Sequence, residues 1–223
     1  LICLTPTPTQ APRSSLAHMF ETVRQKLGAP ASAFVGAIDA TGAWTLDFDA
    51  TLAALDFGPG TTDCGLILGT AFSFVHLCDF LAEKNLKLKL PPGSVVMETG
   101  GYKNRSRTMP KAELHALITD RLDVPPENIL CEYGMSELSS QAYSIRSSEF
   151  QFPPWARVQI ISPESGTEVA DGETGLVRVI DLANVFSVAA IQTEDLAIRR
   201  GDGFELIGRA THAENRGCSL MTA

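Results

Sequence analysis

The sequence lacks an excess of positive charge. Its 223 residues include 18 Lys and Arg against 26 Asp and Glu, which gives a formal net charge of −8. It also lacks any run rich in lysine or arginine. Because binding to a phosphate backbone needs a basic face, these absences argue against a nucleic acid as the main partner.

Paired cysteines are missing as well. The five cysteines are an odd number, are widely spaced and include no C-x-x-C pair, so neither a disulfide framework nor a zinc site is indicated. This usage fits a reducing cytoplasm, and we expect a cytoplasmic protein. The longest apolar stretch, residues 65–82, is interrupted by Ser73, His76 and Asp79, so no membrane span is expected.

The beginning of the chain has neither an initiating Met nor the features of a targeting segment. The residues from Leu1 to Thr9 include no basic region and too short an apolar run for a signal peptide. The missing Met raises the question of whether these residues are the whole protein.

Helix-like and strand-like patterns alternate up to about residue 148. Ser14 and Ser15 can cap a helix whose apolar residues recur at helical spacing up to Leu27. Further helices are expected over 48–57, 72–81 and 110–122, and strands over 33–38, 64–68, 94–97 and 129–133. Short apolar strands alternating with helices predict an α/β fold with a mostly parallel sheet layered with helices, over residues 1–148.

The pattern changes after residue 148, where short alternating runs replace the helices. Strands are expected over 158–161, 176–180, 188–191, 196–199 and 204–207, and Asp202-Gly203 is a hairpin signal between the last two. We therefore predict a second domain, residues 149–223, that is a smaller β-rich subdomain, antiparallel or barrel-like.

Two loops are the strongest candidates for ligand binding, because ligands of open α/β sheets bind beyond the carboxyl ends of strands. The first loop contains Gly100-Gly101 and then the cations Lys103, Arg105 and Arg107, which could face an anion. An ordinary turn with a solvated basic segment explains this loop equally well. The second loop, residues 132–138, brings an aromatic ring, a glycine, a hydroxyl and a carboxylate into one short segment.

Residue types in the second loop indicate roles. Tyr133 offers a flat face for a base, Ser136 a hydroxyl for a phosphate or carboxylate oxygen, and Glu137 an oxygen ligand for Mg²⁺. A nucleophile elbow is excluded for Ser136, because the G-x-S-x-G pattern needs glycine where Leu138 stands.

These residues carry a family resemblance. Residues 133–137 resemble the Tyr-Gly-x-Thr/Ser-Glu motif of adenylate-forming enzymes, 193–195 their Thr-Gly-Asp motif, and 208–209 the Gly-Arg that follows it. An ordered set of segments resembles, more specifically, the acyl-protein synthetase family, the fatty-acid ligases of bacterial luminescence systems and their non-luminous relatives. The segments are 69–72, 98–101, 133–141, 154–155, 181–184 and 213–220.

The resemblance implies an adenylate-forming fold and a two-step reaction. A carboxylic acid, most simply a long-chain fatty acid, would react with ATP to give acyl-adenylate and pyrophosphate. The acyl group would then move to a cysteine and on to a partner acyl reductase or another acceptor. By matching positions, the residues implied for binding ATP with Mg²⁺ are Gly100 and Gly101 (adenine pocket), Tyr133 and Gly134 (stacking motif), Ser136, Glu137 (Mg²⁺), Asp195 (ribose) and Arg209 (ribose or phosphate).

Cys218 matches the acyl-accepting cysteine near the family's C-terminus. Independently of the resemblance, Arg216 and His212 lie nearby in sequence, and neighbouring cations favour the nucleophilic thiolate. Cys64, Cys78 and Cys131 lie in apolar runs and are expected to be buried and inert.

Two family features are missing. No Ser/Thr/Gly-rich phosphate loop occurs before Ala31, so we expect an N-terminally truncated chain, and no lysine follows Arg209, which leaves the adenylation lysine unassigned. Two other functions stay open. The protein could resemble phenylacetate-CoA ligases, with free coenzyme A as acyl acceptor, or the chain could be a non-catalytic binding module.

Overall fold

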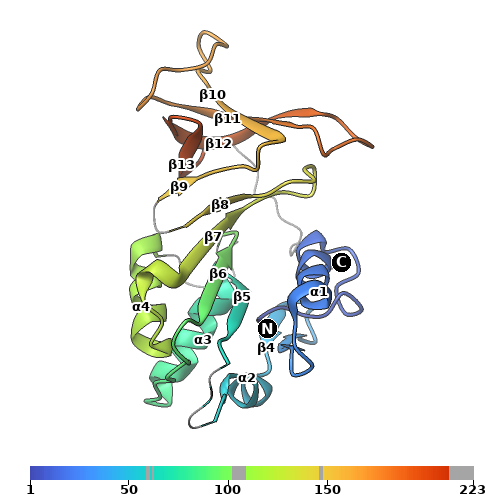
Figure 1. Cartoon of the computed structure of the whole chain (residues 1–223), viewed down its shortest axis with the longest axis vertical. Helices are drawn as coiled ribbons and strands as arrows, with labels where there is room; N and C mark the ends of the chain where they lie inside the picture. The colour runs from blue at the N-terminus through green and yellow to red at the C-terminus, as the bar shows by residue number, and fades with distance from the viewer. Residues whose placement is uncertain (59–60, 62, 102–108, 146–147, 211–223) are drawn as a thin grey trace. The chain divides into compact units, whose positions relative to one another are not determined.

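The computed structural model describes residues 1–58, 61, 63–101, 109–145 and 148–210, and Figure 1 shows its elements. Contacts divide the chain into two compact units. Of the described residues, the first contains those from Leu1 to Leu130, and the second contains those from Cys131 onward.

A parallel sheet forms the centre of the first unit. Its strands follow the order β2 (Ala33–Phe34), β1 (Ile2–Cys3), β5 (Leu66–Thr70) and β6 (Val95–Thr99), and each neighbouring pair is parallel. The helices are α1 (Ser15–Leu27), α2 (Phe48–Leu55), α3 (Ala71–Glu83) and α4 (Lys111–Leu122), with a short 3₁₀ turn η1 at Pro126–Asn128. This arrangement confirms the predicted α/β class.

Alternation along the strands distributes their side chains between two apolar clusters. Ile67 and Val96 join the cluster that includes residues of α3 and α4, whereas their sequence neighbours Leu68 and Met97 join the cluster that includes Phe20 of α1. Successive strand side chains point to opposite faces of a sheet. Both faces of this sheet are therefore covered, which explains why its strands are almost continuously apolar.

Helix starts follow the sequence signals closely. Ser14 caps α1 by accepting a hydrogen bond from the amide of Ala17 at 3.2 Å. Thr70 and Ser73 form a reciprocal capping box at the start of α3, a motif that satisfies amides left unpaired in the first turn. Pro110, predicted as the first helical residue, lies one position earlier as the N-cap of α4.

The predicted strand over 33–38 divides into two. β2 joins the parallel sheet, whereas β3 (Gly36–Ile38) pairs antiparallel with β4 (Trp44–Leu46). Gly36 marks the change of partner: its amide donates to the carbonyl of Thr5 at 3.1 Å, and a Cβ there would lie 2.1 Å from the backbone of Thr5. The close backbone approach needs a glycine at this point.

The second unit is built on an antiparallel sheet of five strands. Their order is β10 (Ala156–Ile161), β11 (Thr174–Asp181), β12 (Ala190–Arg200), β13 (Gly203–Arg209) and β9 (Glu149–Phe150). β7 (Ile129–Tyr133) runs into this unit and pairs antiparallel with β8 (Ala142–Ser144). The β-rich subdomain is thus confirmed, with the predicted runs 188–191 and 196–199 joined into one long strand.

The hairpin between β12 and β13 turns one residue earlier than the sequence signal. Arg200 pairs with Gly203, so Gly201 and Asp202 form the two-residue turn. Gly201 has a φ of 58°, a left-handed conformation that glycine adopts without strain.

Contacts place the division between the units at Leu130 and Cys131, whereas the sequence pattern places it after residue 148. The difference arises because β7 and β8 contribute to the core of the second unit: Cys131, Tyr133 and Ala142 cluster with valines of the five-stranded sheet. Tyr143 also forms two backbone hydrogen bonds with Gln151. The chain therefore enters the core of the second unit at Cys131, before its sequence pattern changes from helical to strand-like after residue 148.

No helix among the described residues is long and apolar enough to cross a membrane.

Candidate functional site

Tyr133 ends β7 inside an aromatic cluster of the second unit. Its ring contacts the rings of Phe150, Phe152 and Phe204 edge-on, with centroids 5.2 to 6.4 Å apart. The side chain is 7% exposed, and burial, followed by the nearby Asp195 carboxylate, raises the pKa of its phenol far above the usual range. The phenol therefore stays protonated and acts as a hydrogen-bond donor.

Asp195 links Tyr133 to Arg209. The phenol of Tyr133 donates to Oδ2 of Asp195 at 2.7 Å, and Nε of Arg209 lies 3.2 Å from Oδ1. Arg209 also forms an ion pair with Glu194 at 3.3 Å. Three residues that the sequence nominates for nucleotide binding thus form one network across β7, β12 and β13. A carboxylate accepts about four hydrogen bonds, so Asp195 keeps acceptor capacity for further donors.

Ser136 and Glu137 lie on the turn that follows. The amide of Leu138 donates to the carbonyl of Met135 at 3.1 Å, which places Ser136 and Glu137 at the centre of the turn, both exposed. The Leu138 side chain is buried in the core of the unit and anchors the turn. Gly134, also exposed, separates the strand from the turn; a Cβ there would lie 2.4 Å from a carboxylate oxygen of Glu132.

The carboxylate of Glu137 fits the one protein ligand expected for Mg²⁺ in this arrangement. Mg²⁺ is commonly held by one or two carboxylates together with substrate phosphates and waters. An exposed carboxylate on the turn that directly follows Tyr133 and Gly134 is compatible with that requirement.

The predicted glycine loop belongs to the first unit. Gly100 and Gly101 follow β6 directly and are exposed, and Gly100 has a φ of 68°. No described atom lies within 4 Å of a Cβ built at either position, so the backbone here is open to approach. Lys103, Arg105 and Arg107 lie outside the described residues.

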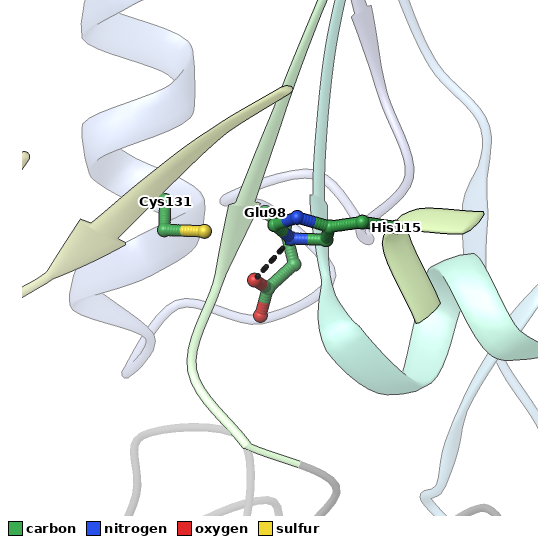
Figure 2. A group of neighbouring side chains, drawn as sticks. All are labelled: Glu98, His115 and Cys131. Atoms are coloured by element: carbon green, nitrogen blue, oxygen red, sulfur yellow. Dashed lines mark ion pairs between the residues drawn. The ribbon is translucent and has the colours of Figure 1, made fainter. Parts of the chain in front are cut away.

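A buried carboxylate precedes this loop. Glu98 on β6 is 7% exposed, and its Oε2 lies 3.7 Å from Nε2 of His115 on α4. Figure 2 shows the imidazole facing the carboxylate. The pair joins β6 to α4 two residues before the glycine loop.

The cysteines divide by burial. Cys3, Cys78 and Cys131 are buried, and burial raises the pKa of the Cys3 thiol to about 12. Cys64 is exposed, so its predicted burial is wrong: it lies before β5 begins, outside the sheet core. Cys218 and His212 lie outside the described residues.

Sequence reasoning assigned no role to Asp181 and Asn184, which the structure connects to the Ser136–Glu137 turn. Asp181 is fully buried at the end of β11 and accepts hydrogen bonds from the amides of Ser139 and Ser140. A signal was present: Val177, Val179 and Asp181 share the inward face of one strand, and a carboxylate in that register requires buried donors.

The fold is that of adenylate-forming enzymes. The ATP-bound structure of MatB from Rhodopseudomonas palustris is similar over 93% of this chain and 40% of its own length, with a TM-score of 0.60 and 14% identity. An ATP-bound RpMatB-BxBclM chimera has the same coverage, TM-score and identity. At this identity the likeness shows the fold alone.

The profile of the family described as "Acyl-protein synthetase, LuxE" matches residues 4–223, and the chain belongs to this family. A long-chain-fatty-acid–luciferin-component ligase of Aliivibrio fischeri is 26% identical over 168 residues, which are 70% of this chain and 44% of the relative. That of Vibrio harveyi is 23% identical over 186 residues, 78% of this chain and 49% of the relative. The chain thus spans about half the length of these curated relatives.

Proposed function

We propose that the protein containing this chain activates a carboxylic acid, specifically a long-chain fatty acid, with ATP. The Tyr133–Asp195–Arg209 network carries this proposal, because it joins three nucleotide-binding candidates within one unit. Family membership over residues 4–223 supports the same reaction class. The curated relatives are named as ligases of long-chain fatty acids.

In the first step, a carboxylate oxygen of the acid bonds to the α-phosphorus of ATP, and pyrophosphate leaves with the electrons of the broken P–O bond. Asp195 accepts hydrogen bonds from the ribose hydroxyls while Arg209 donates to ribose or phosphate oxygens. The resemblance assigns Gly100 and Gly101 to the adenine. The Tyr133 ring is 7% exposed and packed among phenylalanine rings, so Tyr133 acts through the hydroxyl that holds Asp195. Glu137 would hold Mg²⁺, whose charge would neutralise that of the phosphates, and Ser136 donates to a phosphate or carboxylate oxygen.

In the second step, the Cys218 thiolate bonds to the acyl carbon, and AMP leaves. The resulting thioester is a carrier from which a reductase partner or another acceptor takes the acyl group. The exposed Cys64 provides a matched thiol with no assigned role.

A groove in the second unit is our proposed place for the acyl part of the acid. Its lining is mixed, with polar Gln141, Glu149 and Gln151 beside apolar Ile145 and Pro153. It has a volume of about 600 Å³ and begins at Ser139 and Ser140, immediately after the turn. Tyr143, Phe152 and Trp155 contribute aromatic walls. Ligand pockets of this size, roughly 300 to 1,000 Å³, accommodate small molecules, so we place the acyl chain here.

The test uses the intact protein that contains this chain. ATP–pyrophosphate exchange is measured with saturated fatty acids of increasing length, and we expect exchange only when a long-chain acid is present. Labelled fatty acid should then appear on the protein as a hydroxylamine-sensitive thioester that Cys64→Ser retains and Cys218→Ser loses.

Other results contradict specific steps. A thioester that persists in Cys218→Ser would overturn the transfer to this cysteine. Formation of acyl-CoA from free coenzyme A with an unlabelled protein would favour a coenzyme A ligase. Absence of ATP–pyrophosphate exchange with every acid would favour the non-catalytic binding module.

A further inference from the structure

The turn that carries Ser136 and Glu137 is held from the strand that ends at Asp181. Asp181 is fully buried, and its carboxylate accepts four hydrogen bonds. Two come from the amides of Ser139 and Ser140, at 3.0 and 2.8 Å. The others come from the Ser140 hydroxyl at 2.8 Å and the Ala183 amide at 3.0 Å. Each donor lies immediately after the turn or in the Asp181 loop itself.

Asn184 holds the turn at a second point. Its Nδ2 donates to the carbonyl of Glu137 and to that of Val188, both at 2.8 Å. Its Oδ1 accepts from the Ser139 hydroxyl at 3.1 Å. The backbone of Glu137 is therefore tied to Asn184, while the side chain of Glu137 stays exposed.

The loop after β11 has an inverted pattern of burial. Its polar residues Asp181 and Asn184 are buried, whereas its apolar members are exposed, namely Leu182, Val185, Phe186 and Val188. A loop stabilised by its own apolar packing would show the opposite pattern. Burying a carboxylate and an amide costs free energy unless hydrogen bonds replace those with water. Here the replacement partners lie chiefly on residues 137–140, so the buried polar groups serve that segment.

Trp155 adds a third contact to the same segment. Its Nε1 donates to the hydroxyl of Ser140 at 3.0 Å, and the amide of Leu182 donates to the Trp155 carbonyl at 3.0 Å. The indole, half exposed, thus reports on the position of Ser140.

We propose that Asp181 and Asn184 are positioning residues, which hold the backbone of residues 137–140 so that Ser136 and Glu137 face the reacting phosphate and carboxylate. The inference rests on the proposed function for its chemistry, but the restraint on the turn is a property of this unit alone. The proposal divides the site into two parts. The Tyr133–Asp195–Arg209 network binds the nucleotide, and the restrained turn stabilises the transition state.

The test compares Asp181→Asn and Asn184→Ala with Asp202→Asn in the intact protein. Asp202 is an exposed aspartate on the β12–β13 turn and controls for the loss of one negative charge. We expect the two loop variants to lower kcat for ATP–pyrophosphate exchange at least tenfold, with KM for ATP changed less than threefold. Loss of a transition-state contact has this signature. A smaller folded fraction would lower total activity but leave kcat per folded molecule unchanged, so the folded fraction of each variant is measured alongside. The control should match the wild type.

A second measurement needs no activity. Hydrogen–deuterium exchange of the amides of Ser139 and Ser140 should be at least tenfold faster in Asp181→Asn than in the wild type, with the β12 amides unchanged. In a Trp44→Phe background, Trp155 fluorescence should also shift in Asp181→Asn.

The outcomes separate the two proposals. Absence of exchange activity in the wild type overturns the proposed function. Unchanged amide exchange at Ser139 and Ser140 in Asp181→Asn overturns the restraint. A fall in kcat that accompanies an equal rise in KM for ATP overturns the division between nucleotide binding and turn positioning.

Discussion

The phenol of Tyr133 donates a 2.7 Å hydrogen bond to the carboxylate of Asp195, although 62 residues separate them in sequence. This bond ties the end of β7 to β12 and leaves the other carboxylate oxygen beside Arg209. A tyrosine that served core packing alone could be a phenylalanine, so we assign the hydroxyl a separate role, which is to orient Asp195.

Replacing Tyr133 with Phe tests this role. The ring packing remains, but Asp195 loses a donor, and we expect the second unit to be destabilised by about 1 to 2 kcal/mol. Urea unfolding followed by Trp155 fluorescence measures the change in a Trp44→Phe background. Tyr143→Phe, at a half-exposed position of the same unit, should change stability by less than about 0.5 kcal/mol. Equal effects of the two variants would refute a special role for the Tyr133 hydroxyl.

Arg209→Gln separates binding from stability. Its ion pairs with Asp195 and Glu194 are partly exposed, and such pairs contribute about 1 kcal/mol or less. We therefore expect little change in unfolding but at least a tenfold weaker affinity for ATP, measured by isothermal titration. Arg178→Gln removes a guanidinium that contacts Gln192 in the same sheet and should leave ATP affinity unchanged. An Arg209→Gln protein with wild-type affinity would remove Arg209 from the site.

Asp181 should make stability depend on pH. Burial alone raises the pKa of this carboxyl, but hydrogen bonds from Ser140, Ala183 and Ser139 outweigh it and lower the pKa below its ordinary value. An aspartate in an unfolded chain has a pKa of about 3.9. The stabilisation is then fully present above about pH 4 and is lost as the pH falls toward the lower folded-state pKa.

Asp181→Asn should remove that component of the acid dependence. We expect the variant to be about 2 kcal/mol less stable than the wild type at neutral pH, with the difference narrowing below about pH 4. Unfolding free energies measured from neutral to acidic pH provide the comparison, with Asp202→Asn alongside. A constant difference across this range would show that the charge of Asp181 does not matter.

Gly100 and Gly101 should respond differently to alanine. Gly100 has a φ of 68°, and an L-residue in that conformation costs about 1 kcal/mol, so Gly100→Ala should lower the stability of the first unit by about that amount. Neither position has a described atom within 4 Å of a built Cβ, so Gly101→Ala should be close to neutral. Unfolding followed by Trp44 fluorescence, in a Trp155→Phe background, measures both.

Thiol accessibility provides a direct check on the cysteine assignments. In Cys218→Ser protein, Cys64 should be the cysteine of the described residues that reacts rapidly with a thiol reagent under native conditions, located by peptide mass spectrometry, and Cys64→Ser should abolish that labelling. Cys3, Cys78 and Cys131 are buried and should react only after unfolding. Rapid labelling of Cys3, Cys78 or Cys131 in the native Cys218→Ser protein would contradict this burial.

Local patterns predicted most of the fold. Some signals act within a single helix or strand and can be recognised in a short stretch of sequence. Examples are the Ser14 cap, the apolar spacing of α1 and the alternation in β11. The location of Cys64 was predicted wrongly because an apolar neighbourhood in sequence does not guarantee a place in the sheet.

The candidate site was predictable as a set of residue types but not as a network. Sequence motifs nominated Tyr133, Asp195 and Arg209 separately, since each lies in its own short segment. That the phenol and the guanidinium share one carboxylate follows from strand order, because β12 pairs with β13 and packs against the aromatic core that contains Tyr133.

The sequence alone thus determined the α/β layer and the later β-rich part, because periodicity, caps and turn residues are local, while the candidate site residues were nominated by the motifs that carry the family resemblance. Only the tertiary structure decided what Asp181 and Asn184 do. Their partners on residues 137–140 lie 41 to 47 positions earlier in the chain. The role of a buried carboxylate depends on the donors that the folded backbone brings to it.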